Sequence, residues 1–200
     1  MVDTSGTNVR EPGTRAGRER AVGRDVARER EAIEGEIEGR TLVSALADTV
    51  ARLGDAPALH WRDAHRWHDP APGGWQSLSW RGFAERIRWV AGGLRLLGVE
   101  RGRCVVLSAG SHLAHLLADQ AALQLGATPV SLYPTLSVEQ LAFHAGHCGA
   151  RVAVVEGQVR LDRALAAGCF DRIVAVDATA DDPRVVRWAT WLEEGRAEHE

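Results

Sequence analysis

Short apolar runs alternate with longer segments of helical periodicity between Cys104 and Val176. The runs cover residues 104–107, 128–132, 151–155 and 172–176, and they are apolar on both faces. Strands of that kind belong in parallel sheets, where helices cover both faces. Alternation of strands and helices also favours right-handed crossover connections. The sequence therefore predicts an α/β fold, with a mostly parallel sheet flanked by helices.

Serine and glycine residues mark where two of the predicted helices begin and end. Ser79 is a good N-cap for an apolar helical stripe that ends at Gly98. Ser137 and Gln140 have the spacing of a capping box, and Gly149 follows as the end of that helix. Both helices therefore have bounds that the sequence itself predicts.

Another helix is predicted from Ser111, its expected cap, to Leu125. Its apolar residues run around most of its circumference, so we expect it to be well buried, with Leu116 between the sheet and its neighbours. Upstream, residues 41–53 predict a helix, and residues 58–62 and 76–80 predict a hairpin around a turn rich in Pro and Gly.

Residues 1–40 differ from the rest of the chain in composition. They contain eight Arg, nine Asp or Glu, and no aromatic residue. Such a segment buries too little apolar surface to offset the entropy of ordering the chain, so we expect a disordered charged tail. The alternative is a charged helix, because Val22, Val26, Ile33 and Ile37 lie at helical spacing. Hydrogen exchange across this segment distinguishes the two states.

Composition narrows the class of protein further. The formal net charge of −3 gives no basic footprint, so we expect no nucleic-acid partner. The sequence has neither an apolar run that could cross a bilayer nor the apolar core of a secretory signal. The three cysteines, Cys104, Cys148 and Cys169, lack metal-ligand spacing and suit reduced thiols. We therefore expect a cytoplasmic protein with no transmembrane segment.

Several segments from Thr41 onward resemble the first part of adenylate-forming enzymes, in particular long-chain fatty acid–CoA ligases. The most specific is Ala118–Phe143, ADQAALQLGATPVSLYPTLSVEQLAF. Leu78–Leu107, LSWRGFAERIRWVAGGLRLLGVERGRCVVL, resembles a helix-and-strand unit of that family. Asp55–Leu59, DAPAL, and His147–Glu156, HCGARVAVVE, fit the same register. The resemblance implies that residues 41–200 are a partial AMP-binding synthetase domain, its first α/β subdomain.

Members of this acyl-CoA synthetase family join a carboxylic acid to the AMP of ATP and then transfer the acyl group to CoA. The resemblance therefore implies ATP, Mg²⁺ and CoA as family cofactors and a fatty acid as substrate. Family members hold the phosphates with a Ser/Thr/Gly-rich loop ending in Pro-Lys and use a later lysine on the acyl phosphate. That loop is missing here, and all 24 basic residues are Arg. We expect a ligase fragment, truncated before the phosphate loop, that is inactive and binds no cofactor alone.

In that interpretation the chain supplies scaffold and one wall of an acyl channel. It would then self-associate or join a chain that carries the missing catalytic half. The alternative is a stand-alone acyl- or partner-binding module that kept the fold and lost catalysis. A dinucleotide-binding domain is disfavoured, because the turns after Leu107 and Leu132 lack Gly-x-Gly-x-x-Gly.

Tyr133, Pro134 and Thr135 are the candidate substrate-binding residues. They follow a predicted parallel strand, and ligands of such sheets bind beyond the carboxyl ends of the strands. The alternative is a simple turn, since Pro fixes φ and the segment leads into a capped helix. No residue is assigned a catalytic role or a metal.

Two groups of potential metal ligands stand out in the sequence: His144, His147 and Cys148, and the pair His112 and His115. A zinc site needs three or four converging ligands with supporting carboxylates, and neither group has that pattern. Packing at a helix surface is the expected role of these side chains.

Overall fold

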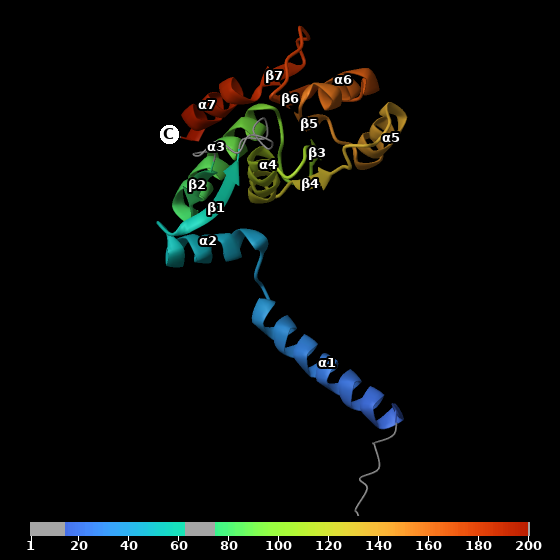
Figure 1. The fold of residues 1–200 in the computed structure, drawn as a ribbon. Helices are drawn as coiled ribbons and strands as arrows, with labels where there is room; N and C mark the ends of the chain where they lie inside the picture. The colour runs from blue at the N-terminus through green and yellow to red at the C-terminus, as the bar shows by residue number, and fades with distance from the viewer. Residues whose placement is uncertain (1–14, 63–74, 200) are drawn as a thin grey trace, which may run out of the picture. The chain divides into compact units, whose positions relative to one another are not determined.

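The computed structural model describes residues 15–62 and 75–199, and the chain divides into two compact units, residues 1–41 and 42–200. The predicted turn rich in Pro and Gly lies outside the described residues. The first unit contains helix α1, Arg15–Ile37 (Figure 1). Every side chain from Asp25 to Arg40 is exposed.

Helix α1 corresponds to the charged-helix alternative, and the disordered state of residues 1–40 in solution stays a prediction. A helix closes its backbone hydrogen bonds within the segment itself, so it needs no partner strand, although without packing its stability in water is marginal. Arg30 Nε lies 2.6 Å from Glu34 Oε1, one turn along, which adds a small and salt-sensitive stabilisation. The residues from Asp25 to Arg40 bury no side chain, in keeping with the composition from which disorder was predicted.

The second unit is built on a five-stranded sheet in which every pair of neighbours is parallel. The strand order is β4-β3-β5-β6-β7. The strands are β3 Cys104–Ser108, β4 Thr128–Ser131, β5 Val152–Glu156, β6 Arg172–Val176 and β7 Val185–Arg187. The predicted α/β fold with a mostly parallel sheet is confirmed, and β7 is an additional edge strand. A separate antiparallel hairpin pairs β1, Pro57–Arg62, with β2, Trp75–Ser79.

Helices cover both faces of the sheet (Figure 1). Helices α3, Trp80–Leu96, α4, Leu113–Gln124, and α7, Trp188–His199, pack on one face. Helices α5, Val138–Cys148, and α6, Gln158–Ala167, pack on the other. Helix α2, Leu42–Leu53, contributes Leu46 to the α3 side. Alternate strand residues face opposite sides, so Val105 and Leu107 join the first core and Val106 joins the second.

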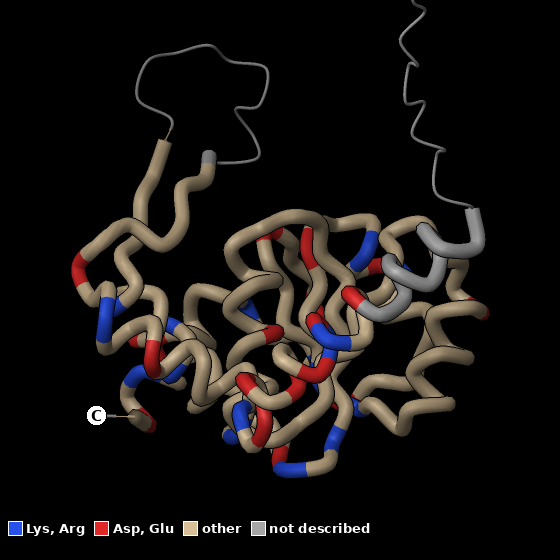
Figure 2. Tube along the Cα trace, turned by 90° about the horizontal axis from the view of Figure 1, so that it is seen from below, with Lys and Arg blue, Asp and Glu red and all other residues tan. Residues whose placement is uncertain are grey.

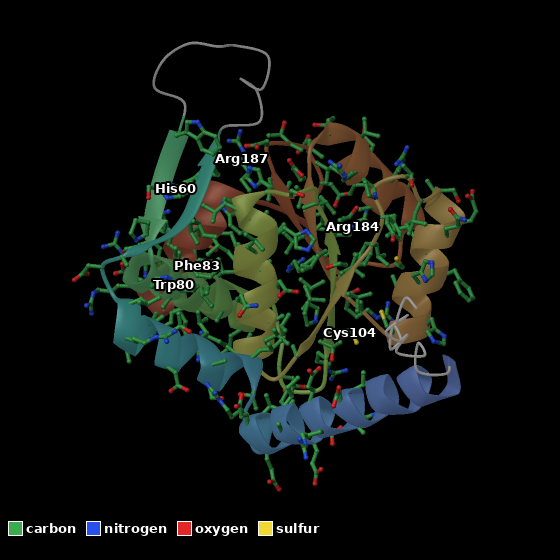
Figure 3. The ribbon with its side chains drawn as sticks, turned by 60° about the horizontal axis from the view of Figure 1, so that its bottom comes forward. His60, Trp80, Phe83, Cys104, Arg184 and Arg187 are labelled. Atoms are coloured by element: carbon green, nitrogen blue, oxygen red, sulfur yellow. The ribbon has the colours of Figure 1, made fainter. Side chains whose placement is uncertain are left out.

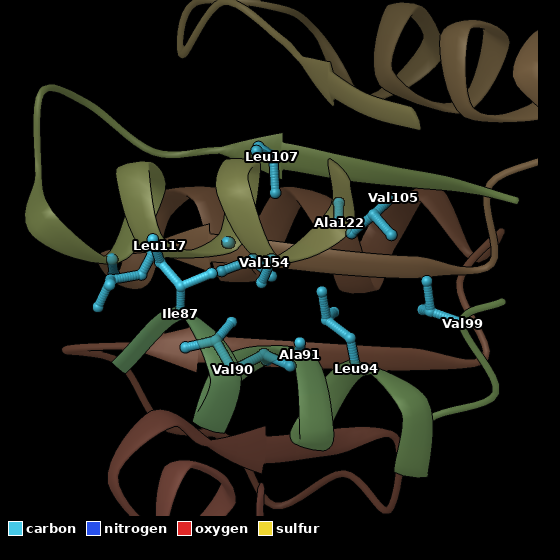
Figure 4. Close-up of a cluster of buried hydrophobic side chains, with 14 of the residues drawn as sticks. Ile87, Val90, Ala91, Leu94, Val99, Val105, Leu107, Leu117, Ala122 and Val154 are labelled. Atoms are coloured by element: carbon cyan, nitrogen blue, oxygen red, sulfur yellow. The ribbon is translucent and has the colours of Figure 1, made fainter. Parts of the chain in front are cut away.

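The first core is formed where α3 and α4 lie against β3 and β5. Ile87, Val90 and Leu94 of α3 are fully buried, and they point towards Leu117 of α4 and Val154 of β5 (Figure 4). At the start of α3, Trp80 and Phe83 meet edge to face with their ring centroids 6.5 Å apart (Figure 3). These contacts extend the core towards the β1–β2 hairpin, whose Trp61 also packs on it.

The predicted helix caps are mostly confirmed. The Ser79 hydroxyl accepts a hydrogen bond from Gly82 N at 3.2 Å. Ser137 and Gln140 form the full capping box, and Gly149 ends α5 in the left-handed conformation at φ 66°. The predicted cap of α4 is wrong, because α4 begins after His112, whose Nδ1 accepts from Ala114 N at 3.1 Å. Ser111 lies one residue too early to accept that bond.

The predicted burial of Leu116 is also wrong. Leu116 is 46% exposed, and its neighbour Leu117 is 2% exposed. Helix α4 is apolar on most sides, so its sequence alone did not determine which of the two leucines faces the core. Leu116 instead lines a cleft beyond the carboxyl ends of β3 and β4.

Glycines allow α3 and α7 to approach closely. A Cβ added at Gly93 would lie 2.5 Å from Cε2 of Trp191, a side chain that is 1% exposed. A Cβ at Gly195 of α7 would overlap Trp89 O and lie 2.5 Å from Gly93 N, and both of these are backbone atoms. Backbone atoms within helices move little, so a side chain at Gly195 would force the two helices apart.

We expect Gly195→Ala to lower the free energy of unfolding by about 1–3 kcal/mol, the usual cost of overpacking a core. Gly146→Ala in α5 is the matched control, since nothing lies within 4 Å of its added Cβ. The control should be neutral or stabilising by up to about 1 kcal/mol, because Ala favours helix over Gly. Urea unfolding of both variants measures the difference, and equal stabilities would contradict the close approach.

We expect Leu117→Ala to destabilise the protein by about 2–5 kcal/mol, as large-to-small core changes do. Leu116→Ala should cost less than about 0.5 kcal/mol, as at other surface positions. Chemical denaturation of the two variants tests the orientation of α4. The reverse order of the two losses would show that Leu116 faces the core after all.

Candidate cleft at the carboxyl ends of β3 and β4

A cleft of about 610 Å³ opens where strands β3 and β4 end. One wall is the segment 109–112 with the first turn of α4, and the other is the segment 131–134. The complete lining is Ala109, Gly110, Ser111, His112, His115, Leu116, Ser131, Leu132, Tyr133 and Pro134. Ligand sites of α/β proteins lie beyond the carboxyl ends of strands, and pockets of this size hold small molecules. The cleft is therefore the candidate binding site.

His115 links the two walls through both of its ring nitrogens. Its Nδ1 lies 3.2 Å from Ala109 O, and its Nε2 lies 2.9 Å from Ser131 Oγ. A carbonyl oxygen only accepts, so Nδ1 carries a proton and donates to Ala109 O. In the neutral ring Nε2 then accepts the proton of the Ser131 hydroxyl. This arrangement fixes the tautomer and leaves the hydroxyl oxygen of Ser131 able to accept from a ligand.

The lining has an apolar character with a few hydroxyl and imidazole groups. Leu116, Leu132 and Pro134 supply apolar surface, and Ser111, Ser131 and Tyr133 supply hydroxyls. No lysine, arginine, aspartate or glutamate is among the residues that line the cleft. Unpaired charges are costly to desolvate, so this surface suits the uncharged, apolar part of a ligand better than a polyphosphate.

Two of the three predicted substrate-binding residues line the cleft. Tyr133 and Pro134 belong to its wall, with the Tyr133 side chain 80% exposed, whereas Thr135 is not among the lining residues. Their role in binding stays a prediction. Sequence reasoning missed His115, Ser131 and Leu116, whose contribution depends on bringing α4 beside β4. The sequence did contain one sign of the first wall. The Ser-Ala-Gly-Ser segment at the end of β3 indicates a second loop at the carboxyl ends of the strands.

The other candidate metal-ligand histidines and the cysteines have structural roles in the fold. His112 caps α4, and the rings of His144 and His147 lie against Phe143, at centroid distances of 5.6 and 6.1 Å. Burial raises the pKa of the Cys104 and Cys169 thiols, so both stay protonated and weakly nucleophilic. Within the described ranges, no group of three or more His, Cys, Asp or Glu side chains could hold a metal ion.

The residues present do not fit ATP with Mg²⁺. A magnesium ion needs oxygen ligands, usually carboxylates together with phosphates, and the cleft has no carboxylate. The phosphates would need cations, and the chain has no lysine while no arginine lines the cleft. The same shortage of cations applies to the phosphates of CoA. The lining of the cleft therefore suits neither the phosphates of these cofactors nor their metal ion.

Residues of opposite charge are intermixed along the described part of the chain. Figure 2 shows Arg interspersed with Asp and Glu along the trace rather than gathered in one basic area. None of the helices in the described part of the chain is long and apolar enough to cross a membrane.

The sequence matches the AMP-binding enzyme family over residues 46–199. An uncharacterized protein of Mycobacterium tuberculosis, Rv1549, is 40% identical over 138 residues, which are 68% of this chain and 73% of that protein. A long-chain-fatty-acid–CoA ligase of Xenopus laevis, ACSBG2, is 30% identical over 62% of this chain and 16% of its own length. A 2-succinylbenzoate–CoA ligase of Salmonella typhimurium is 38% identical over 41% of this chain and 18% of its own.

Solved structures share the fold at lower identity. The A domain of a carboxylic acid reductase from Segniliparus rugosus matches with a TM-score of 0.65 and 18% identity, over 84% of this chain and 32% of that chain. The anthranilate CoA ligase AuaEII matches with a TM-score of 0.61 and 19% identity, over 76% of this chain and 26% of that chain. This chain therefore spans only a third or less of either structure. The family match covers more than half of the chain, and the protein belongs to the AMP-binding enzyme family.

Proposed function

We propose that the chain is the N-terminal part of an ATP-dependent, AMP-forming fatty acid–CoA ligase. In this proposal it supplies scaffold and one wall of the acyl channel and is inactive alone. The observation that carries the proposal is the uncharged cleft at the carboxyl ends of β3 and β4, in a chain of the AMP-binding family. The two CoA ligases among its relatives support a ligase over other members of that family.

A fatty acid suits the chemistry of the cleft. Leu116, Leu132 and Pro134 would contact the alkyl chain, and desolvating that chain supplies most of the binding free energy. Tyr133 would lie along the same chain with its hydroxyl towards solvent. The reacting carboxyl group would lie outside this lining, because nothing in it neutralises developing negative charge on a phosphate.

A second candidate is a stand-alone module that binds an acyl group or a partner without catalysis. The observation that favours it is the Mycobacterium tuberculosis relative, which is itself a short chain, since 138 residues are 73% of it. In the first candidate the exposed apolar side chains Leu116, Tyr133 and Phe143 would contact a second α/β unit on another chain or a second copy. In the second candidate these side chains would remain exposed or would contact only the ligand.

Binding of a fluorescent fatty acid, 11-(dansylamino)undecanoic acid, tests the acyl-wall proposal, with dodecanoate as the competitor. We expect Leu116→Glu to weaken binding at least tenfold, about 1.4 kcal/mol, because a carboxylate beside the alkyl chain loses hydration. Leu96→Glu is the matched control, since Leu96 is 51% exposed and is not among the cleft residues. The purified chain should also show no fatty-acid-dependent exchange of pyrophosphate into ATP. Equal binding by the two variants, or measurable exchange, would overturn the corresponding part of the proposal.

Sedimentation of the purified chain over a hundredfold range of concentration separates the two candidates. A ligase part that lacks its partner should self-associate, because contiguous exposed apolar surface drives association. The sedimentation coefficient should then rise with concentration. A monomer throughout that range, together with binding of the fluorescent fatty acid, would favour the stand-alone module.

A further inference from the structure

The two walls of the cleft are tied to the same segment of the chain, residues 156–163. This segment joins the end of β5 to α6 and does not itself line the cleft. We call residues 109–112 the β3 wall and residues 131–134 the β4 wall. Each wall forms one hydrogen bond with a charged side chain of the segment, and each bond involves a backbone atom of the wall.

Glu156 holds the β3 wall. Gly110 N donates to Glu156 Oε2 at 2.7 Å, and the Glu156 side chain is only 17% exposed. Arg160 Nη1 donates to Glu156 O at 2.8 Å and lies 3.8 Å from Glu156 Oε2. This arginine therefore helps to orient the carboxylate. The contact joins residues 46 positions apart in the sequence and connects the β3 loop to β5.

Arg163 holds the β4 wall. Its Nη1 donates to Pro134 O at 2.6 Å, across 29 positions of sequence. Proline has no N–H with which to anchor the loop, so this carbonyl is the backbone group of Pro134 available for a hydrogen bond. Arg163 itself is half-buried on α6, one turn after Arg160. The bond therefore fixes the position of the loop that carries Tyr133.

We propose that Glu156 and Arg163 are positioning residues that together set the separation of the two walls, and so the cross-section of the ligand that the cleft accepts. The consequence for the ligand rests on the proposed acyl-binding function. When both walls are held at a fixed separation, the cleft favours ligands of one width. When one wall is released, the cleft can adjust to ligands of several widths. His115 links the walls from within the lining of the cleft, and the two charged residues hold the loops from outside it.

The test uses the full chain with three substitutions at the ties and one control. Glu156→Gln and Arg163→Gln weaken one tie each, and Arg163→Lys keeps a cationic donor. Arg151→Gln is the control, because Arg151 also donates to a backbone carbonyl, Cys169 O at 3.4 Å, but lies just before β5, at the amino ends of the strands. All four variants should unfold within about 4 °C of the unsubstituted protein.

Hydrogen exchange measures the ties without any ligand. We expect Glu156→Gln to speed exchange of the Gly110 amide at least tenfold. Arg163→Gln should do the same for the Leu136 amide, which donates to Tyr133 O at 3.3 Å. Arg163→Lys and Arg151→Gln should leave the Leu136 amide within about twofold of the unsubstituted rate. Unchanged exchange at Gly110 and Leu136 in the two Gln variants would overturn the proposal.

Selectivity is the second readout, with dodecanoate compared against 2-butyloctanoate, a branched acid of the same carbon number. Arg163→Gln should reduce the preference between the two acids at least threefold, and Arg163→Lys should restore it. A loss of affinity that is equal for both acids would overturn the role in setting ligand width. If the unsubstituted chain binds neither acid while exchange rises as expected, the acyl-binding function fails and the positioning of the walls stands.

Discussion

The parallel sheet requires apolar cover on both faces, and the rest of the unit follows from that requirement. Strands β3, β5 and β6 have almost no exposed side-chain surface in their central residues. Helices α3, α4 and α7 supply one cover and α5 and α6 the other, each contacting alternate residues of the same strands. The edge strands β4 and β7 are only partly buried. The cleft forms beyond the carboxyl ends of β3 and β4, between the loops that follow these strands and the first turn of α4.

The packing of helices on the α3 side of the sheet depends on how closely α3 and α7 approach each other. Gly93 and Gly195 leave room for Trp191 and for the backbone of the opposing helix. Trp191 then reaches the same core as Val174 and Val176 of β6. The contact of Trp191 anchors α7 in the unit. The glycines leave room for this contact, so α7 needs no long apolar stripe.

Sequence patterns predicted what depends on local periodicity and capping. The strands from β3 to β6, the capping box of Ser137 and the left-handed Gly149 all follow from residues close together in the chain. The failures have a shared cause in tertiary packing. Helix α4 is apolar on most sides, so only its neighbours decide that Leu117 and not Leu116 faces inward. Strand β7 is three residues long, too short for its alternation to be distinctive.

The candidate site was predictable in part for the same reason. Tyr133 and Pro134 follow a recognisable strand, so their place at the sheet edge could be expected. The contacts of His115 with Ser131, and of Glu156 with Gly110, join residues 16 and 46 positions apart, and no local pattern encodes them. The Glu156 carboxylate and the Arg163 guanidinium lie outside the lining of the cleft and form hydrogen bonds with the backbone of its walls. The residues that line the cleft are uncharged. A cleft built in this way distinguishes ligands by shape and apolar area, and any chemistry on a phosphate must come from groups outside it.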